Sequence, residues 1–137
     1  DIGKLAMGLV IPPAEVTAVL NANCSDVTTR ERDEWGFDHA QVGAALGRSW
    51  GLPEELLNGI RFHHNPPVDD MADDLYDIIH CADGIALILG YGVGFDGLSY
   101  SVNLESRENL GFDRAGFEDV MVSVRLRMDE FLSPAGG

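Results

Sequence analysis

Apolar side chains recur every three or four positions along most of this chain, which is the spacing of an amphipathic helix. The pattern predicts helices over residues 1–10, 14–21, 28–35, 39–50, 53–64, 70–89, 104–110 and 113–132. Asp38 is placed to cap the start of one predicted helix, and Gly36 and Gly51 are placed to follow helix ends. Only residues 99–104 alternate as a strand would, and they do so weakly. The sequence therefore predicts an all-α fold built as a bundle of helices.

Length and composition are those of one soluble domain. The chain has 137 residues, of which 45% are hydrophobic and 23% are charged. Its longest apolar run falls far short of the roughly 20 residues that cross a bilayer, and the first residues do not resemble a secretion signal. Cys24 and Cys81 are far apart and form no zinc-binding or disulfide pattern. These features predict a cytoplasmic protein that has no membrane partner.

The chain is strongly acidic, with a net charge of −14. A surface that binds a nucleic-acid duplex or anionic lipid needs a basic patch to displace counterions. The nine Lys and Arg residues are instead scattered along the sequence. The composition therefore predicts that nucleic acid is not a partner, and solubility explains the acidity.

Five ionisable side chains fall on or beside the apolar stripes of four predicted helices. They are Asp1, His39, His63, His64 and Asp83. A carboxylate on a core-facing stripe is costly unless it is paired or binds a metal, and facing helices of a bundle can bring such groups together. Nitrogen and oxygen ligands of this kind suit Mn, Fe, Zn or, less readily, Mg. Spacing alone leaves two alternatives: one shared divalent-metal site, or separate buried polar pairs with some residues facing solvent.

Five short segments resemble, in order, the motifs of one family. They are DIGKL at residues 1–5, GFDHAQVG at 36–43, WGLPEEL at 50–56, IRFHHNP at 60–66 and IIHCAD at 78–83. Together they make the sequence similar to HDOD domains, which belong to the HD superfamily of metal-dependent phosphohydrolases. The resemblance spans the chain and implies an HD-like multi-helix bundle. It also implies that residues 1–137 are the C-terminal part of one HDOD domain, without its N-terminal helices and the histidine before Asp1.

In catalytic relatives the matching residues bind one or more metal ions, so the resemblance implies the same five side chains as ligands here. Lys4 matches a motif lysine that lies near the phosphate, and its alternative is a solvated lysine on the outer helix face. Relatives that cleave cyclic dinucleotides carry a Gly-Tyr-Pro stretch after the paired histidines, which this sequence lacks.

The resemblance implies the role that HDOD domains generally have, a non-catalytic bacterial signalling module joined to other signalling domains or proteins. One alternative is a metal-dependent phosphohydrolase or phosphodiesterase that acts on a nucleotide or cyclic dinucleotide. The other is a structural helical adaptor, in which the histidines are ordinary buried residues.

Three further features each have two interpretations. His80 is either a partner that orients Asp83 or a partly exposed helix residue. An acidic cluster is either a solvated first helical turn or a docking surface, and it comprises Asp69, Asp70, Asp73, Asp74 and Asp77. The apolar stripe of the last helix either packs on the bundle or meets a partner, and it comprises Phe117, Val120, Met121, Val124, Met128 and Phe131.

Overall fold

The computed structural model describes residues 1–21, 26–68, 71–91 and 102–133, and within these ranges it contains eight helices and no strand. In chain order they are α1 (Ile2–Val10), α2 (Pro13–Asn21), α3 (Val27–Trp35), α4 (His39–Ser49), α5 (Glu54–Phe62), α6 (Asp74–Ile88), α7 (Leu104–Asn109) and α8 (Arg114–Leu132). The all-α prediction is confirmed. None of the described helices is both long and apolar enough to cross a membrane. Cys24 and the first three residues of the weakly alternating segment lie outside the described ranges.

Short polar side chains fix where several helices begin. Asp38 and Gln41 form a reciprocal capping box before α4. The Gln41 amide donates to Asp38 Oδ1 at 2.8 Å, and the Asp38 amide donates to Gln41 Oε1 at 3.2 Å. The Asp113 carboxylate likewise accepts from the Gly116 amide at 2.7 Å at the start of α8. Because the box fixes the first turn of α4, His39 is its first helical residue, and its side chain is buried.

Two predicted helix boundaries are wrong by a few residues. The long helix predicted from residue 70 begins at Asp74, because the Asp73 side chain caps it by accepting from the Leu75 amide at 2.8 Å. The helix predicted to reach residue 64 ends at Phe62, and His63 is its C-cap. The paired histidines therefore lie in the turn after α5, where both side chains can point inward.

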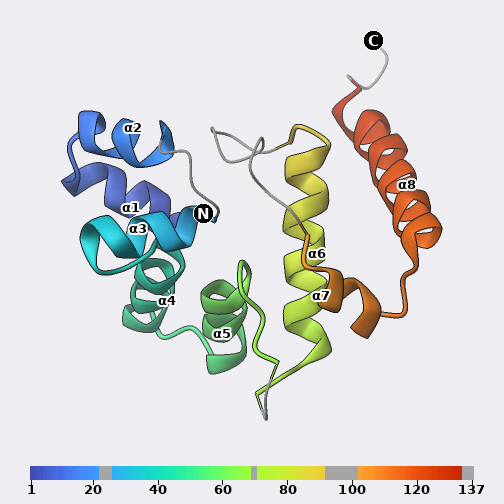
Figure 1. Ribbon diagram of the computed structural model, residues 1–137, viewed down its shortest axis with the longest axis horizontal. Helices are drawn as coiled ribbons and strands as arrows, with labels where there is room; N and C mark the ends of the chain where they lie inside the picture. The colour runs from blue at the N-terminus through green and yellow to red at the C-terminus, as the bar shows by residue number, and fades with distance from the viewer. Residues whose placement is uncertain (22–25, 69–70, 92–101, 134–137) are drawn as a thin grey trace.

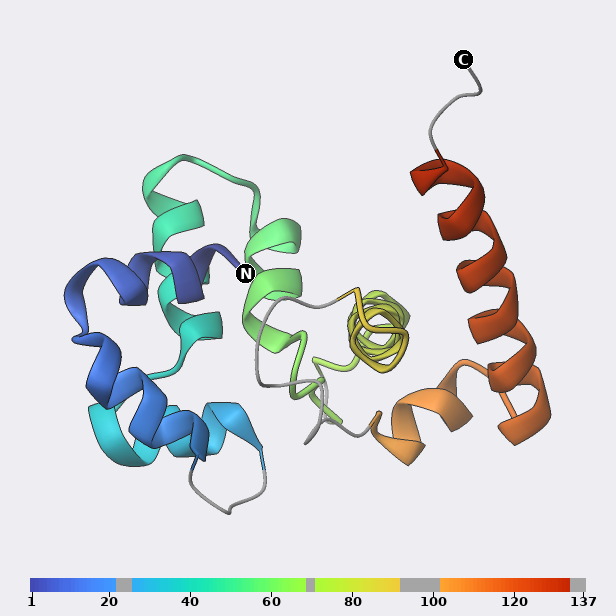
Figure 2. The ribbon, with the colours of Figure 1, turned by 90° about the horizontal axis from the view of Figure 1, so that it is seen from above.

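The first four helices gather on one side of the molecule, as Figure 1 and Figure 2 show from two directions. Helix α5 lies next to this group, and α6 runs between α5 and the outer helix α8. The N-terminus lies on the inner side of the first group, close to α5 in both views. Asp1 is therefore near the middle of the molecule.

Helix α1 crosses the start of α4 at very short range. A Cβ atom on Gly3 would lie 1.8 Å from the His39 carbonyl oxygen and 2.9 Å from the Gly43 nitrogen. Only glycine permits this approach, since any side chain would overlap the backbone of α4. The contact holds the start of α1 beside His39. The sequence pattern places Asp1 in line with the apolar residues Leu5 and Leu9. Leu5 is 70% exposed, however, so this stripe is not the face of α1 that packs.

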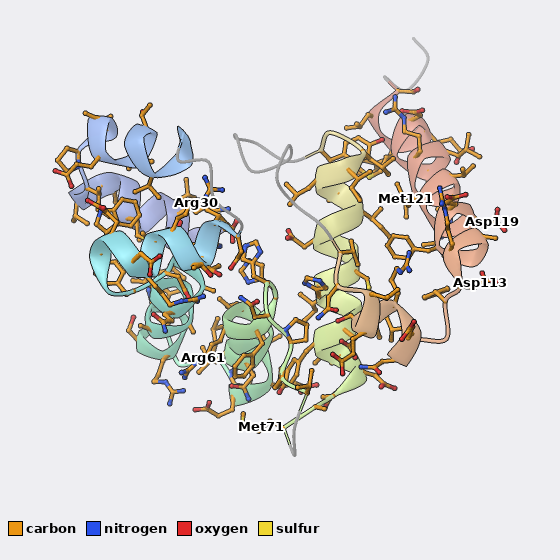
Figure 3. All side chains as sticks on the ribbon, viewed as in Figure 1. Arg30, Arg61, Met71, Asp113, Asp119 and Met121 are labelled. Carbon is orange, nitrogen blue, oxygen red and sulfur yellow. The ribbon has the colours of Figure 1, made fainter. Side chains whose placement is uncertain are left out.

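The C-terminal helices pack around an apolar core. Its buried members are Cys81, Ile85 and Phe117. Met121 lies on the side of α8 that faces α6, and Asp119 lies on the opposite side (Figure 3). The predicted stripe of α8 thus packs on the bundle over its first part, whereas Phe131 near the end of the helix is 82% exposed.

Candidate metal centre

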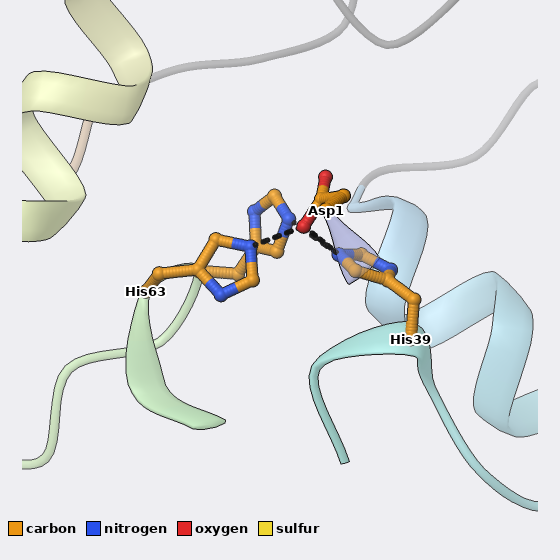
Figure 4. Close-up of side chains that lie close together, drawn as sticks. Asp1, His39 and His63 are labelled. Atoms are coloured by element: carbon orange, nitrogen blue, oxygen red, sulfur yellow. Dashed lines mark hydrogen bonds and ion pairs between the residues drawn. The ribbon is translucent and has the colours of Figure 1, made fainter. Parts of the chain in front are cut away.

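Four of the five predicted ligands converge. Asp1, His39, His63 and His64 each offer one nitrogen or oxygen atom, and these atoms all lie within 4.8 Å of one another. The residues come from the start of α1, the start of α4 and the turn after α5 (Figure 4). The three histidines are buried, while the Asp1 side chain is 33% exposed. The cluster is thus enclosed on the histidine side and accessible on the Asp1 side.

The spacing of these atoms is close to what a single divalent ion requires. Asp1 Oδ1 lies 3.3 Å from His63 Nε2 and 3.7 Å from His39 Nε2, and the Nε2 atoms of His39 and His64 are 2.9 Å apart. Metal–ligand bonds of about 2.0–2.2 Å place neighbouring ligand atoms about 3 Å apart and opposite ones about 4 Å apart. The four side chains therefore fit one ion after a small inward movement of the most distant pair.

A buried carboxylate orients His39. Glu31 Oε2 accepts from the His39 backbone amide at 2.8 Å and lies 2.6 Å from His39 Nδ1. With the hydrogen on Nδ1, the lone pair of the ring is on Nε2, which faces the cluster. Carboxylates commonly hold metal-binding histidines in this way. Glu31 was not predicted, because its helix carries other acids next to it and the sequence does not distinguish them.

The turn that carries the histidine pair is fixed at several points. His63 Nδ1 lies 2.7 Å from the Ile60 carbonyl oxygen and donates to it, which leaves the Nε2 lone pair directed at Asp1. The Asn65 side chain donates to Thr28 Oγ1 of α3 at 3.2 Å. Both contacts hold the pair in place without using the atoms that face the cluster.

His80 of α6 also supports this turn. It is 2% exposed, which contradicts the expectation of a partly exposed residue. Its Nδ1 lies 2.8 Å from the His63 carbonyl oxygen, and its Nε2 accepts from the Asn103 amide at 3.0 Å. These two contacts join the histidine pair to the start of α7.

Burial favours the neutral form of His63 and His64, which is the form that can bind a cation. Burial lowers the pKa of His64 to about 2, and the neighbouring His63 and His39 rings act in the same direction. Burial also lowers the pKa of His63. A neutral imidazole keeps a lone pair on one ring nitrogen, and a metal ion can bind that lone pair.

Lys4 and Asp83 lie at the edge of the cluster. Lys4 Nζ forms an ion pair of 3.0 Å with Asp1 Oδ2, so this lysine is not simply a solvated residue on the outer face of α1. Asp83 is not among the four converging residues. It lines the same pocket as Asp1, His39 and His63, and its Oδ2 is buried without a hydrogen bond among the described residues.

The acidic cluster at the start of α6 is not uniformly solvated. Asp73 and Asp74 occupy the exposed cap and first turn, as expected. Asp77 is 6% exposed and accepts a hydrogen bond of 2.9 Å from the Asn109 side chain, so it joins α6 to α7. Asp69 and Asp70 lie outside the described residues.

Comparison with known proteins gives a family match and two partial relatives. A 29-residue segment is 62% identical to a protein of Treponema pallidum that is described only as uncharacterized; it covers 21% of this chain and 6% of that protein. An 81-residue segment is 31% identical to ribonuclease Y of Thermus thermophilus and covers 58% of this chain and 14% of that protein. The chain therefore spans only a small part of these relatives. No solved structure matches it.

The described helices bring three imidazoles and a carboxylate to one point. Residues 1–66 match the HDOD domain family. All four converging side chains fall within the matched residues. The cluster that they form could hold a metal ion.

Proposed function

We propose that this chain is part of a bacterial regulatory module that binds one divalent metal ion and does not catalyse a reaction. The observation that carries the proposal is the convergence of four ligand atoms within 4.8 Å, three of them on buried histidines. The orientation of His39 by Glu31 supports it, because metal-binding histidines commonly donate their other ring N–H to a carboxylate.

The residues that would hold the ion are Asp1, His39, His63 and His64, and Asp83 would join them from α6. Three imidazoles with carboxylate oxygen suit Mn, Fe or Zn better than Mg, which prefers oxygen ligands. In a non-catalytic module the ion would supply a structural cross-link between α1, α4 and the turn after α5. Its binding would stabilise the folded state by an amount that grows with the logarithm of its free concentration divided by its dissociation constant.

Two features support a role without catalysis. Lys4 is already paired with Asp1, so its positive charge is partly neutralised and less available to a phosphate. Among the described residues, the pocket beside the cluster is lined by no Lys or Arg that could neutralise a phosphate. The partners of this module would be other signalling domains or proteins in the cytoplasm. Nucleic acid would not be a partner, because a net charge of −14 repels its phosphates.

The second candidate function is that of a metal-dependent phosphohydrolase or phosphodiesterase acting on a nucleotide or cyclic dinucleotide. The similarity to ribonuclease Y favours it. A bound ion would then lower the pKa of a water molecule and polarise a phosphate. The histidines and Asp1 would position the ion, and Lys4 would have to leave Asp1 to contact the phosphate.

Metal analysis of the purified full-length protein tests metal binding directly. We expect about one equivalent of Mn, Fe or Zn, or its uptake when offered, and its loss in the variant Asp1→Asn. The control is Asp119→Asn on the outer side of α8, which should bind as the parent does. Absence of any divalent ion after loading with Mn, Fe and Zn would remove the metal-binding proposal.

Assays of the metal-loaded protein with cyclic dinucleotides, nucleotides and a short RNA separate the two functions. The regulatory proposal predicts no turnover above that of a His63→Ala variant. Turnover that requires both the ion and His63 would establish the hydrolase instead.

A further inference from the structure

An open pocket of roughly 470 Å³ adjoins the cluster. Asp1, His39 and His63 belong to both, so a molecule in the pocket would have one end at the metal-binding atoms. The volume lies within the range of about 300–1,000 Å³ that is usual for small-molecule sites. The pocket is therefore large enough for a ligand with a body as well as a head group.

The walls of the pocket away from the cluster are apolar. Leu56 and Ile60 line it from α5, Leu75 and Ile79 line it from α6, and Leu52 lies before α5. Leu56 is 53% exposed although it borders this pocket. Removing this apolar wall from contact with water is favourable. A hydrocarbon or aromatic group bound in the pocket would cover it.

The charges around the pocket exclude a strongly anionic ligand. Its charged lining residues are the acids Asp1, Glu55 and Asp83, and among the described residues no Lys or Arg lines it. Polyphosphates need several cationic groups or donors to offset their charge. One divalent ion in the cluster, together with the Lys4 ammonium that pairs with Asp1, would balance the three acids, so the site would hold no excess positive charge for a polyanion.

We propose that the pocket binds a small amphipathic monoacid, with its carboxylate at the metal-binding cluster and its apolar body against the leucine and isoleucine wall. The placement of the carboxylate rests on the proposed metal binding, whereas the placement of the apolar body does not. A carboxylate is an oxygen ligand that Mn, Fe and Zn accept. The ligand class is thus set by one site for an oxygen donor and one apolar surface next to it.

Calorimetric titration of the full-length, Mn-loaded protein with octanoate, acetate and pyrophosphate tests this assignment. Each buried methylene should strengthen binding about three- to fourfold, so octanoate should bind at least tenfold more tightly than acetate. Octanoate should also bind more tightly than pyrophosphate. Equal binding of octanoate and acetate, or preferential binding of pyrophosphate, would overturn the proposal.

A matched pair of variants locates the apolar body. Leu56→Trp adds bulk in the pocket wall and should weaken octanoate binding at least tenfold. Leu126→Trp makes the same change at a leucine of α8 that is 60% exposed and lies outside this pocket, and it should have no effect. Neither change touches the four converging residues, so Mn affinity should stay the same in both. An unchanged octanoate affinity in Leu56→Trp would contradict the placement.

Titration with Mn alone separates this inference from the metal-binding proposal. If Mn binds but octanoate gains nothing over acetate, the ligand class is wrong and the metal site stands. If Mn does not bind and octanoate still binds through Leu56, the apolar surface stands and the position of the carboxylate is wrong.

Discussion

In residues 1–66 the buried side chains include three histidines, a glutamate, an aspartate and an arginine, whereas the core of α6 and α8 is formed by Cys81, Ile85 and Phe117. A buried polar group costs free energy unless it has partners. In the first region these partners are present, as Glu31 is for His39 and Asp38 is for the start of α4. The first region therefore contains the cluster of partnered polar groups, and the second contains the apolar core that packs α6 against α8.

The largest expected effect comes from the apolar core. Phe117→Ala should lower the free energy of unfolding by about 4 kcal/mol, because it removes a buried ring and leaves a cavity. Urea denaturation measures this change. Phe131→Ala, at an exposed ring of the same helix, should change stability by less than about 0.5 kcal/mol. If Phe117→Ala also abolished Mn binding in folded protein, the two regions would not be separable as we describe.

The next effect tests the close approach of α1 to α4. Gly3→Ala should cost about 3 kcal/mol of stability, since its Cβ would overlap the His39 carbonyl, and it should weaken metal binding by displacing Asp1. Gly8→Ala is the control in the same helix. Its Cβ would meet no atom within 4 Å, so it should stabilise the protein by about 0.5–1 kcal/mol. Thermal unfolding with and without Mn distinguishes the two variants.

A smaller effect, confined to the polar region, is expected at Glu31. Glu31→Gln should weaken Mn binding by about 10- to 100-fold, because the neutral amide holds the His39 tautomer less firmly. Isothermal titration calorimetry measures the affinity, and the exposed neighbour Glu34→Gln is the control. Equal affinities in the two variants would show that Glu31 does not orient the ligand.

The smallest effect is a pH dependence of the metal-free protein. The pKa of His64 is lowered from 6.5 to about 2 in the folded state, so the unfolded chain binds a proton that the folded chain does not. The contribution of the buried His64 ring to the free energy of unfolding is present above pH 6.5. It is lost as the pH falls below that value, by about 1 kcal/mol per pH unit. Urea midpoints between pH 7.5 and pH 5 measure this slope. His64→Phe should flatten the curve, and an unchanged slope would contradict burial of a neutral ring.

Local signals in the sequence were sufficient to predict where most of the helices lie. Capping residues such as Asp38 and Asp113 act within one turn, so the elements they start could be predicted without knowledge of the packing. The start of α6 was misplaced because several acids compete there as caps, and only the structure shows that Asp73 is used.

Four of the five predicted ligands converge, but Asp1 does so for a reason other than the one that the sequence suggested. Asp1 was expected on a buried apolar stripe, yet Leu9 of that stripe is 87% exposed. Asp1 reaches the cluster because Gly3 lets α1 touch α4, and a contact between distant segments leaves no periodic trace in the sequence. The same holds for Glu31, whose partner lies eight residues away in another helix.

The ring of His80 connects the two regions through one hydrogen bond that it donates and one that it accepts. It donates to the His63 carbonyl and accepts from the Asn103 amide, and only a neutral imidazole with its single hydrogen on Nδ1 can do both. An aliphatic side chain there would leave two backbone groups without partners, one on each side. The His80 ring therefore links the polar region to the C-terminal helices. Its single hydrogen is donated to the His63 carbonyl of the polar region, and its Nε2 lone pair accepts from the Asn103 amide at the start of α7.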